Sequence, residues 1–211
     1  MFRKTIYRAP ILIVWEAWEA RVITIIRRPQ GSVDYRLDGY RLRQEPLRNP
    51  MTIKDVHIRP LDAEEVNLLE EFLYQAIFIP EEVEAPPRSI IESPDLQVYI
   101  EDFGRNETDN ALVAEVDDRV IGAVWTRIMD DYGHIDDETP SFAISLLPEY
   151  RSQGIGTKLM NDMLQLLEDQ GFARASLSVQ KQNYAVNLYL KLGFEVIDET
   201  NEEYLMLIKL H

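Results

Sequence analysis

The strongest constraint on the fold is an apolar segment that leads through a glycine pair into an amphipathic helix. Residues 141–147, SFAISLL, are apolar over most of their length, which indicates a central strand that is covered on both faces. Gly154 and Gly156 follow, and from Leu159 onward the apolar residues recur at helical spacing. A strand that turns through glycines into a helix predicts a sheet with helices packed against it.

The residues from Met51 onward supply the other elements of such a sheet. Their order predicts an α/β fold: a central mixed sheet with helices on both faces and no internal repeat. A hairpin turn is expected at Asp117-Asp118-Arg119, and a proline-rich loop separates the first two helices. The expected strands are 53–58, 111–116, 120–127, 141–147, 175–179, 194–197 and 204–210. The expected helices are 62–77, 93–103, one that follows the glycine pair and stops at Gly171, and 184–192.

The charge of the chain is unevenly distributed. The formal net charge is -15, but residues 1–50 hold ten basic and five acidic residues, whereas residues 51–211 hold 12 basic and 32 acidic residues. A domain with a net charge of -20 repels nucleic acid and anionic lipid and attracts a cationic partner such as an amine. The simpler interpretation is that the acids keep the domain soluble.

The side-chain inventory excludes several kinds of site. The chain has no cysteine, so disulfides, thiolate metal sites and a cysteine nucleophile are excluded. The three histidines are scattered and no pair has metal-site spacing, so we expect no metal. These features favour a cytoplasmic enzyme or binding protein.

The first fifty residues differ from the rest. Their longest apolar run, residues 9–15, is too short to span a bilayer and is followed by Glu16 and Glu19. The charge changes sign near Met51, where a strand and a capped helix begin. We therefore expect residues 1–50 to be a basic extension or a non-native start that carries no chemistry, although a surface-lying amphipathic segment is an alternative. The functional domain is predicted at residues 51–211.

The glycine pair lies where a strand gives way to a helix, and such a junction can bind an anion. The first N–H groups of a helix lack partners inside it, and the helix dipole adds partial positive charge there. Glycine lets a phosphate approach the backbone and permits positive φ angles. Arg151 and Lys158 add formal charge. We interpret the segment as a pyrophosphate cradle; the alternative is a helix start that glycine merely eases.

Two common phosphate motifs fit this cradle poorly. A P-loop ends in Gly-Lys-Ser/Thr, whereas this chain has Gly156-Thr157-Lys158. A dinucleotide-binding turn requires a third glycine where this chain has Leu159.

Two segments in the correct order resemble the GNAT-type acyl-CoA N-acetyltransferases. Residues 151–156, RSQGIG, match the family signature R/Q-x-x-G-x-G/A, and residues 183–194, NYAVNLYLKLGF, resemble the family segment that ends L-Y-x-x-x-G-F. The resemblance covers roughly residues 51–211 and implies the GNAT fold. It also implies transfer of an acetyl group from acetyl-CoA to a primary amine of a small molecule, peptide or protein.

The resemblance also implies roles for individual residues. Backbone amides of the cradle would hold the diphosphate of acetyl-CoA, Arg151 would steady the phosphates, and Leu146 and Leu147 would offer backbone groups to the pantetheine arm and the oxyanion. Asn183 matches a cofactor-contacting asparagine, which could also cap a helix. The cradle residues are Gln153, Gly154, Ile155, Gly156 and Thr157.

The reaction also requires side chains that transfer protons. Tyr189 occupies the family's general-acid position, although it could be a tyrosine that packs in the core. Glu138 is the candidate general base, with Asp136 and Asp137 as alternatives that the sequence does not separate. Direct attack by the amine needs no covalent enzyme intermediate, in keeping with the missing cysteine.

The resemblance implies that the loop between the first two helices, from Ile79 to Arg88, shapes the amine-binding region. Its acids, together with aromatic walls from Trp125 and Tyr132, suit a cation, although all could be solvated surface. A homodimer is compatible with the sequence. The alternative function is a non-catalytic acyl-CoA sensor that uses the same cradle. The acids of the loop are Glu81, Glu82 and Glu84.

Overall fold

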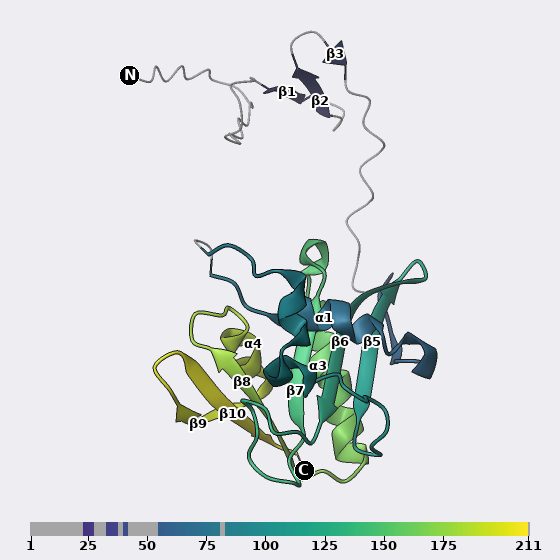
Figure 1. Ribbon diagram of the computed structural model, residues 1–211. Coiled ribbons are helices and arrows are strands. Elements are labelled where there is room, and N and C mark those ends of the chain that lie inside the picture. Colours follow the sequence, from purple (N-terminus) through teal and green to yellow (C-terminus); the bar gives the residue numbers. More distant parts are fainter. Residues whose placement is uncertain (1–22, 28–32, 38–39, 42–54, 81–82, 211) are drawn as a thin grey trace. The chain divides into compact units, whose positions relative to one another are not determined.

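The computed structural model describes residues 23–27, 33–37, 40–41, 55–80 and 83–210 (Figure 1). Its contacts divide the chain into two units, Met1–Met51 and Thr52–His211, which are described separately. In the first unit, β1 (Ile23–Arg27), β2 (Val33–Leu37) and β3 (Tyr40–Arg41) form an antiparallel sheet in that order. The apolar run at residues 9–15 lies outside the described residues.

The second unit is built on one seven-stranded sheet. The strand order is β4-β5-β6-β7-β8-β10-β9, and every neighbouring pair is antiparallel except β7 and β8. The predicted mixed sheet is therefore confirmed. Its strands are β4 (His57–Pro60), β5 (Asn110–Val116), β6 (Arg119–Arg127), β7 (Ser141–Leu146), β8 (Arg174–Gln180), β9 (Glu195–Glu199) and β10 (Glu203–Lys209).

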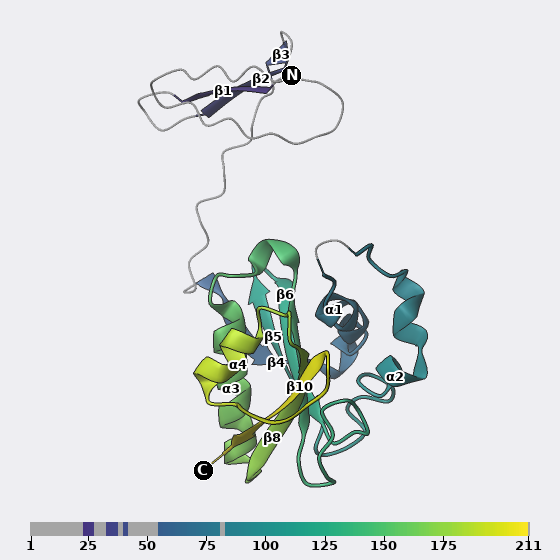
Figure 2. The same cartoon turned by 90° about the vertical axis from the view of Figure 1, so that its left-hand side faces the viewer.

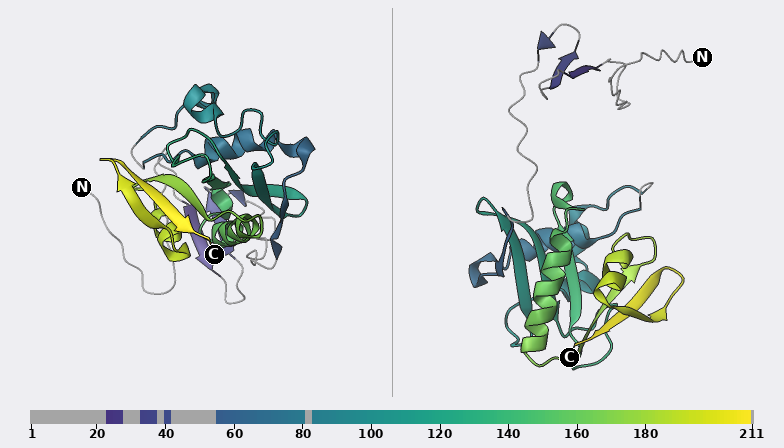
Figure 3. Two further views of the ribbon diagram at one scale, coloured as in Figure 1. Left: turned by 90° about the horizontal axis from the view of Figure 1, so that it is seen from below. Right: turned by 180° about the vertical axis from the view of Figure 1, so that it is seen from behind.

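Helices cover both faces of this sheet (Figure 2). One face carries α1 (Leu68–Ala76), the short η3 (Arg88–Glu92) and α2 (Pro94–Gln97). The other carries α3 (Ile155–Asp169) and α4 (Val186–Leu192), which contact each other (Figure 3). Two further 3₁₀ turns are η2 (Ala63–Glu65) and η4 (Pro148–Tyr150). Among the described helices, none has the length and hydrophobicity needed to cross a bilayer.

Each face has its own apolar core. Beneath α1, Leu69, Phe72 and Leu73 pack with Val113, Ala123 and Trp125 of β5 and β6. Beneath α3, the buried side chains include Leu159, Met163 and Leu167, which recur at helical spacing.

The β5–β6 hairpin follows the sequence prediction. Asp117 and Asp118 have φ angles of 50° and 60°, as a two-residue type I′ turn requires. Aspartate tolerates this left-handed region better than most residues.

The helix expected over residues 93–103 is shorter than predicted, because regular α-helix ends at Gln97. Side chains from β6 donate hydrogen bonds to backbone carbonyls that N–H groups would satisfy in a longer helix. Arg127 Nη1 donates to the carbonyls of Val98 and Glu101, at 3.1 and 2.9 Å, and Trp125 Nε1 donates to the Tyr99 carbonyl at 3.1 Å. These long-range donors hold the segment in turns.

Among the described strands, β7 and β8 form the one parallel pair, and they separate almost as soon as they pair. The register between β7 and β8 contains one pair, Ser141 with Ser176, and the Ser176 N–H donates to the Pro140 carbonyl at 3.0 Å. Beyond that pair, β8 and β10 lean away from β7 (Figure 1). The two strands therefore open a gap at their carboxyl ends.

Candidate active site

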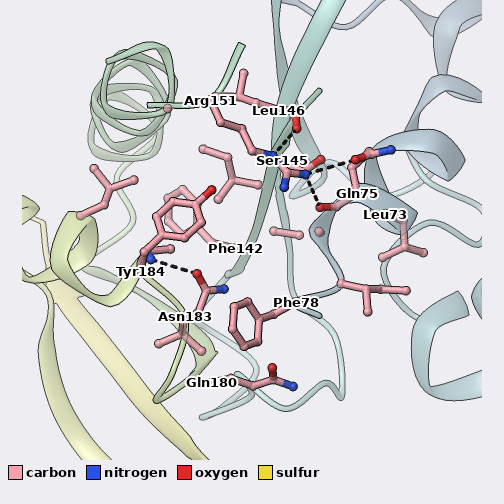
Figure 4. A pocket seen from close by; sticks show the side chains of 18 of the residues that line it. Leu73, Gln75, Phe78, Phe142, Ser145, Leu146, Arg151, Gln180, Asn183 and Tyr184 are labelled. Atoms are coloured by element: carbon pink, nitrogen blue, oxygen red, sulfur yellow. Dashed lines mark hydrogen bonds between the residues drawn. The ribbon is translucent and has the colours of Figure 1, made fainter. Parts of the chain in front are cut away.

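A cavity of about 790 Å³ occupies the gap between β7 and β8. This volume lies within the usual range for small-molecule sites. Its lining comes from residues 142–146 of β7 and 178–180 of β8, from the glycine loop, from α4, and from the end of α1 (Figure 4).

The opening leaves backbone groups of β7 facing the cavity. The Leu147 N–H donates to the Ile121 carbonyl on β6 at 2.9 Å. Since successive residues of a strand direct their N–H groups to opposite sides, those of Ile144 and Leu146 point toward β8. Pairing with β8 has already ended there. These two amides are therefore placed to donate to a molecule in the gap.

The glycine loop presents further amides at the start of α3. Ser152 and Gly154 both have positive φ angles, 59° and 83°, and this alternation turns successive N–H groups to one side. The Lys158 N–H donates to the Gly154 carbonyl at 3.2 Å, so the N–H groups of residues 155–157 precede the first intrahelical bond. Gly154, Gly156 and Thr157 line the cavity. The loop is suited to bind an anion.

The two glycines have different reasons to be glycine. The φ angle of 83° at Gly154 is one that other residues rarely adopt. At Gly156 the fold leaves room: an added Cβ would meet only the Leu146 and Leu188 side chains, at 3.7 and 3.8 Å. The fold therefore requires glycine at position 154 but not at position 156.

Arg151 is held by the protein itself. Its Nε donates to the Leu146 carbonyl at 2.9 Å, and its Nη2 lies 3.1 Å from both the backbone and side-chain oxygens of Gln75 (Figure 4). The side chain thus joins the end of β7 to α1. It lines the cavity, but these bonds aim its guanidinium at carbonyls.

Asn183 and Tyr189 line the other wall. Asn183 Oδ1 accepts from the Ala185 N–H at 2.9 Å, so Asn183 caps the turn before α4. Tyr189 is buried and packs edge-on against Phe194. Its hydroxyl makes no hydrogen bond to the described part of the chain. Burial raises the pKa of this hydroxyl, with a smaller contribution from Tyr184.

Four of the predicted site residues do not line the cavity. Gln153 donates from Nε2 to the Glu149 carbonyl at 2.9 Å, and the Ile155 side chain is buried under α3. The Leu147 N–H donates to the Ile121 carbonyl of β6, so the backbone N–H groups that face the cavity are those of Leu146 and Ile144. Glu138 is exposed in the loop before β7.

The other residues proposed from the same regions also lie outside the cavity, except one. Asp136 pairs with Arg174 and accepts from Thr139, whose hydroxyl contributes most to lowering the Asp136 pKa. Trp125 is fully buried, while Tyr132 does line the cavity. Glu84 and Asp137 are exposed, and Glu81 and Glu82 lie outside the described residues.

Glu203 is a site residue that the sequence did not predict. It begins β10, pairs in register with Gln180 of β8, and lines the cavity together with it. Its Oε2 accepts from Ser178 Oγ at 3.2 Å. The sequence carries no local signal for this position, because the pairing joins strands that are separated by α4 and β9.

A second unpredicted group lies where β7 and β8 meet. Asp131 Oδ2 accepts from Ser141 Oγ at 2.8 Å, while Asp131 Oδ1 is buried without a partner in the described residues. Burial raises the pKa of Asp131, and hydrogen bonds from Ser141 and Tyr99 oppose the rise. Tyr99 itself lines the cavity.

The sequence model of the Acetyltransferase (GNAT) family matches residues 74–194, which are more than half of the chain. The chain belongs to this family. The match contains the glycine loop, β7, β8 and α4, so it includes most of the cavity lining and the amides, whereas Leu73 and Glu203 lie outside the matched residues.

Known proteins support this assignment. N-alpha-acetyltransferase 50 of Danio rerio is 36% identical over 96 residues, which are 44% of this chain and 55% of that protein. The chain thus matches about half the length of this curated relative.

Solved structures share the GNAT fold. PaiA N-acetyltransferase from Thermoplasma acidophilum, in complex with coenzyme A, has a TM-score of 0.56 at 23% identity and covers 73% of this chain and 98% of that one. The structure of YncA from Salmonella typhimurium, with its cofactor acetyl-CoA, has a TM-score of 0.51 at 18% identity; the likeness covers 74% of this chain and 95% of that one. At these identities the likeness concerns the fold.

Proposed function

We propose that this chain transfers the acetyl group of acetyl-CoA to a primary amine by direct attack of the amine. The observation that carries the proposal is the gap between β7 and β8, which runs from free strand amides to the helix-start amides of the glycine loop. A long thioester with a diphosphate at one end matches this arrangement of donors.

The donor set fits acetyl-CoA in its details. The amides at residues 155–157 would hold the diphosphate, with Gly156 leaving space for it next to the backbone. The pantetheine arm would lie along β7 and accept from its free amides. Asn183, whose Oδ1 is engaged in capping, would contact this substrate through Nδ2.

The reaction needs stabilisation of one developing charge. As the amine nitrogen bonds to the thioester carbon, the carbonyl oxygen gains negative charge. The Ile144 and Leu146 amides are fixed donors in a largely apolar gap, where such hydrogen bonds are strongest. The attack gives a tetrahedral intermediate. When it collapses, the C–S bond breaks and the products are the amide and the thiolate of coenzyme A.

Two protons must leave the amine, and one must reach the thiolate. An alkylammonium has a pKa of about 10.4, so one proton must be removed before attack and a second departs as the amide forms. We assign protonation of the thiolate to Tyr189. Its raised pKa keeps the hydroxyl protonated at neutral pH, and its free hydroxyl has no competing partner in the described residues. Because two protons leave the amine and one reaches the thiolate, the reaction releases one proton to solvent.

The experiment that tests this proposal measures release of the free thiol of coenzyme A when the full chain is mixed with acetyl-CoA and a panel of primary amines. Amine-dependent release with formation of the N-acetyl product is expected. Thermal stabilisation by acetyl-CoA without release in the presence of any amine would instead identify a non-catalytic acyl-CoA sensor.

A further inference from the structure

The cavity extends past the glycine loop into a second, largely apolar region. Figure 4 shows Arg151 toward one end of the view, and Phe78 and Gln180 toward the other. This second region lies among the end of α1, the loop after it, η3, α2 and the first residue of β10. The apolar and aromatic residues that line it are Phe78, Ile79, Ala85, Ile90, Leu96 and Tyr99.

Hydrogen bonds and an ion pair attach the wall of this region to α1. The Tyr74 hydroxyl donates to the Pro86 carbonyl at 2.7 Å. Arg88 pairs with Glu71 and stacks on the Tyr74 ring, with 4.8 Å between the guanidinium carbon and the ring centroid. These contacts hold the loop on α1 and engage Glu71 outside the cavity.

The described lining contains a single carboxylate, which belongs to Glu203, and a single guanidinium, which belongs to Arg151. The guanidinium is bonded to carbonyl oxygens at the opposite end. The acid Glu84 of the loop is exposed and does not line the cavity. Among the described residues, Glu203 is therefore the one acid that lines this region, and Glu81 and Glu82 of the same loop lie outside the described residues.

Apolar surface remains open at the mouth of the cavity. Few large hydrophobic side chains of the described chain are exposed, yet Ile90 and Tyr132, which line the cavity, are 37% and 60% exposed. Exposed apolar groups around a cavity favour a ligand that covers them.

We infer that the acetyl acceptor is a primary amine with a single positive charge on an apolar body. The inference rests on the proposed acetyl transfer. Glu203 Oε1 and Oε2 receive the ammonium, and the apolar lining receives the rest of the molecule. Among the described lining residues, a second ammonium of a polyamine would meet apolar groups and no counter-charge, which is strongly unfavourable. Two kinds of molecule have one positive charge on an apolar body: an aromatic monoamine, and the amino terminus of a peptide with an apolar first residue.

The test compares amines that differ in one property at a time, with thiol release as the readout. 2-Phenylethylamine has one charge and an apolar body, ethanolamine has one charge without it, and spermidine has several charges. We expect a kcat/KM for 2-phenylethylamine about tenfold or more above both others. Spermidine or ethanolamine as the best substrate would overturn the inference and leave acetyl transfer established.

Two peptides distinguish the sources of the amine. A short peptide with leucine first and one with lysine first are compared with the monoamine. A higher kcat/KM for the leucine peptide than for the lysine peptide supports the inference, and the reverse preference overturns it. If the leucine peptide also exceeds 2-phenylethylamine, the source is a peptide terminus; if 2-phenylethylamine exceeds the leucine peptide, the source is a small monoamine. If acetyl-CoA binds but no amine is acetylated, the proposed function itself fails.

The role of Glu203 has its own test. Glu203→Gln keeps an oxygen to accept from Ser178 but removes the charge. We expect the KM for 2-phenylethylamine to rise about tenfold while the affinity for acetyl-CoA stays unchanged, which also shows that the variant is folded. The exposed neighbour provides the control, because Glu202→Gln removes an equal charge outside the cavity. Equal KM values for the two variants would refute the assignment.

Discussion

Replacing the first glycine of the loop tests whether its backbone conformation, rather than its lack of bulk, produces the anion site. Gly154 has φ 83° and precedes the first residue of α3. An alanine there must either adopt the left-handed conformation, at about 1–2 kcal/mol, or move the backbone out of it. Moving the backbone would turn the loop amides away from the cavity. Gly154→Ala is therefore expected to lose both stability and affinity for acetyl-CoA.

The size of the effect can be estimated. Alanine also restricts the unfolded chain, which would stabilise the protein by about 0.4–1 kcal/mol if the native angle suited it. The net loss is then about 1 kcal/mol, or a fall in Tm of roughly 2–4 °C for a domain of this size. Binding is expected to lose more, because in the proposed complex several amides point at the diphosphate together. A loss of one such contact, about 1.4 kcal/mol, already weakens Kd tenfold.

The second glycine supplies the matched control. At Gly156 an added Cβ meets its neighbours at 3.7 Å or more, and the φ angle is not positive. Gly156→Ala should therefore leave the unfolding free energy unchanged or raise it by about 0.5 kcal/mol, and Tm should stay the same or rise slightly. It should also keep most of the affinity, whereas a larger residue at the same position would not.

The assays are thermal unfolding for stability and calorimetric titration of acetyl-CoA for affinity. Both are run on the full chain and on the two alanine variants. If Gly154→Ala binds acetyl-CoA as tightly as the parent, or if Gly156→Ala is the more damaging change in both assays, the loop conformation is not what creates the site.

Three further predictions address single side chains. Tyr189→Phe retains the packing on Phe194, so the KM for acetyl-CoA should stay constant while kcat falls about a hundredfold; an unchanged kcat across pH would remove the acid role. Asp131 has a pKa raised above its unfolded value of 3.8, so it contributes stability below that pH and loses it as pH rises through the folded pKa. Asp131→Asn should therefore raise Tm at pH 7 but not at pH 4, with exposed Asp130→Asn as the control, and an equal gain at both pH values would contradict the ionisation argument. Arg151→Ala should lower the unfolding free energy by roughly 2–3 kcal/mol, because it leaves carbonyl oxygens without their charged donor. A loss of acetyl-CoA affinity without a loss of stability would instead indicate direct phosphate contact.

Features that depend on neighbouring residues were predictable from the sequence. The periodicity of α3, the paired aspartates of the β5–β6 turn and the glycine loop each contain their own signal within a few residues. The two motif segments added the family and hence the sheet. For these elements local preference and the final fold agree, so the pattern alone is sufficient.

Features that depend on contacts between distant strands were not predictable. The direction of the Leu147 N–H is fixed by Ile121 on β6, and the position of Glu203 is fixed by its register with Gln180. The early end of α2 depends on Arg127 and Trp125, which approach from β6. A shift of one residue in any of these pairings would reverse which groups face the cavity. No local pattern encodes such a choice.

The charge of the domain illustrates how composition and site can lead to different conclusions. A net charge of -20 over residues 51–211 attracts every cation, and the attraction acts over about one Debye length. It therefore favours spermidine at least as much as a monoamine and cannot select between them. We infer that selection takes place after the amine has lost its water, where Glu203 would meet one ammonium and the apolar lining would exclude a second. On this proposal, the acidic surface raises the local concentration of amines in general, while the cavity determines which of them is acetylated.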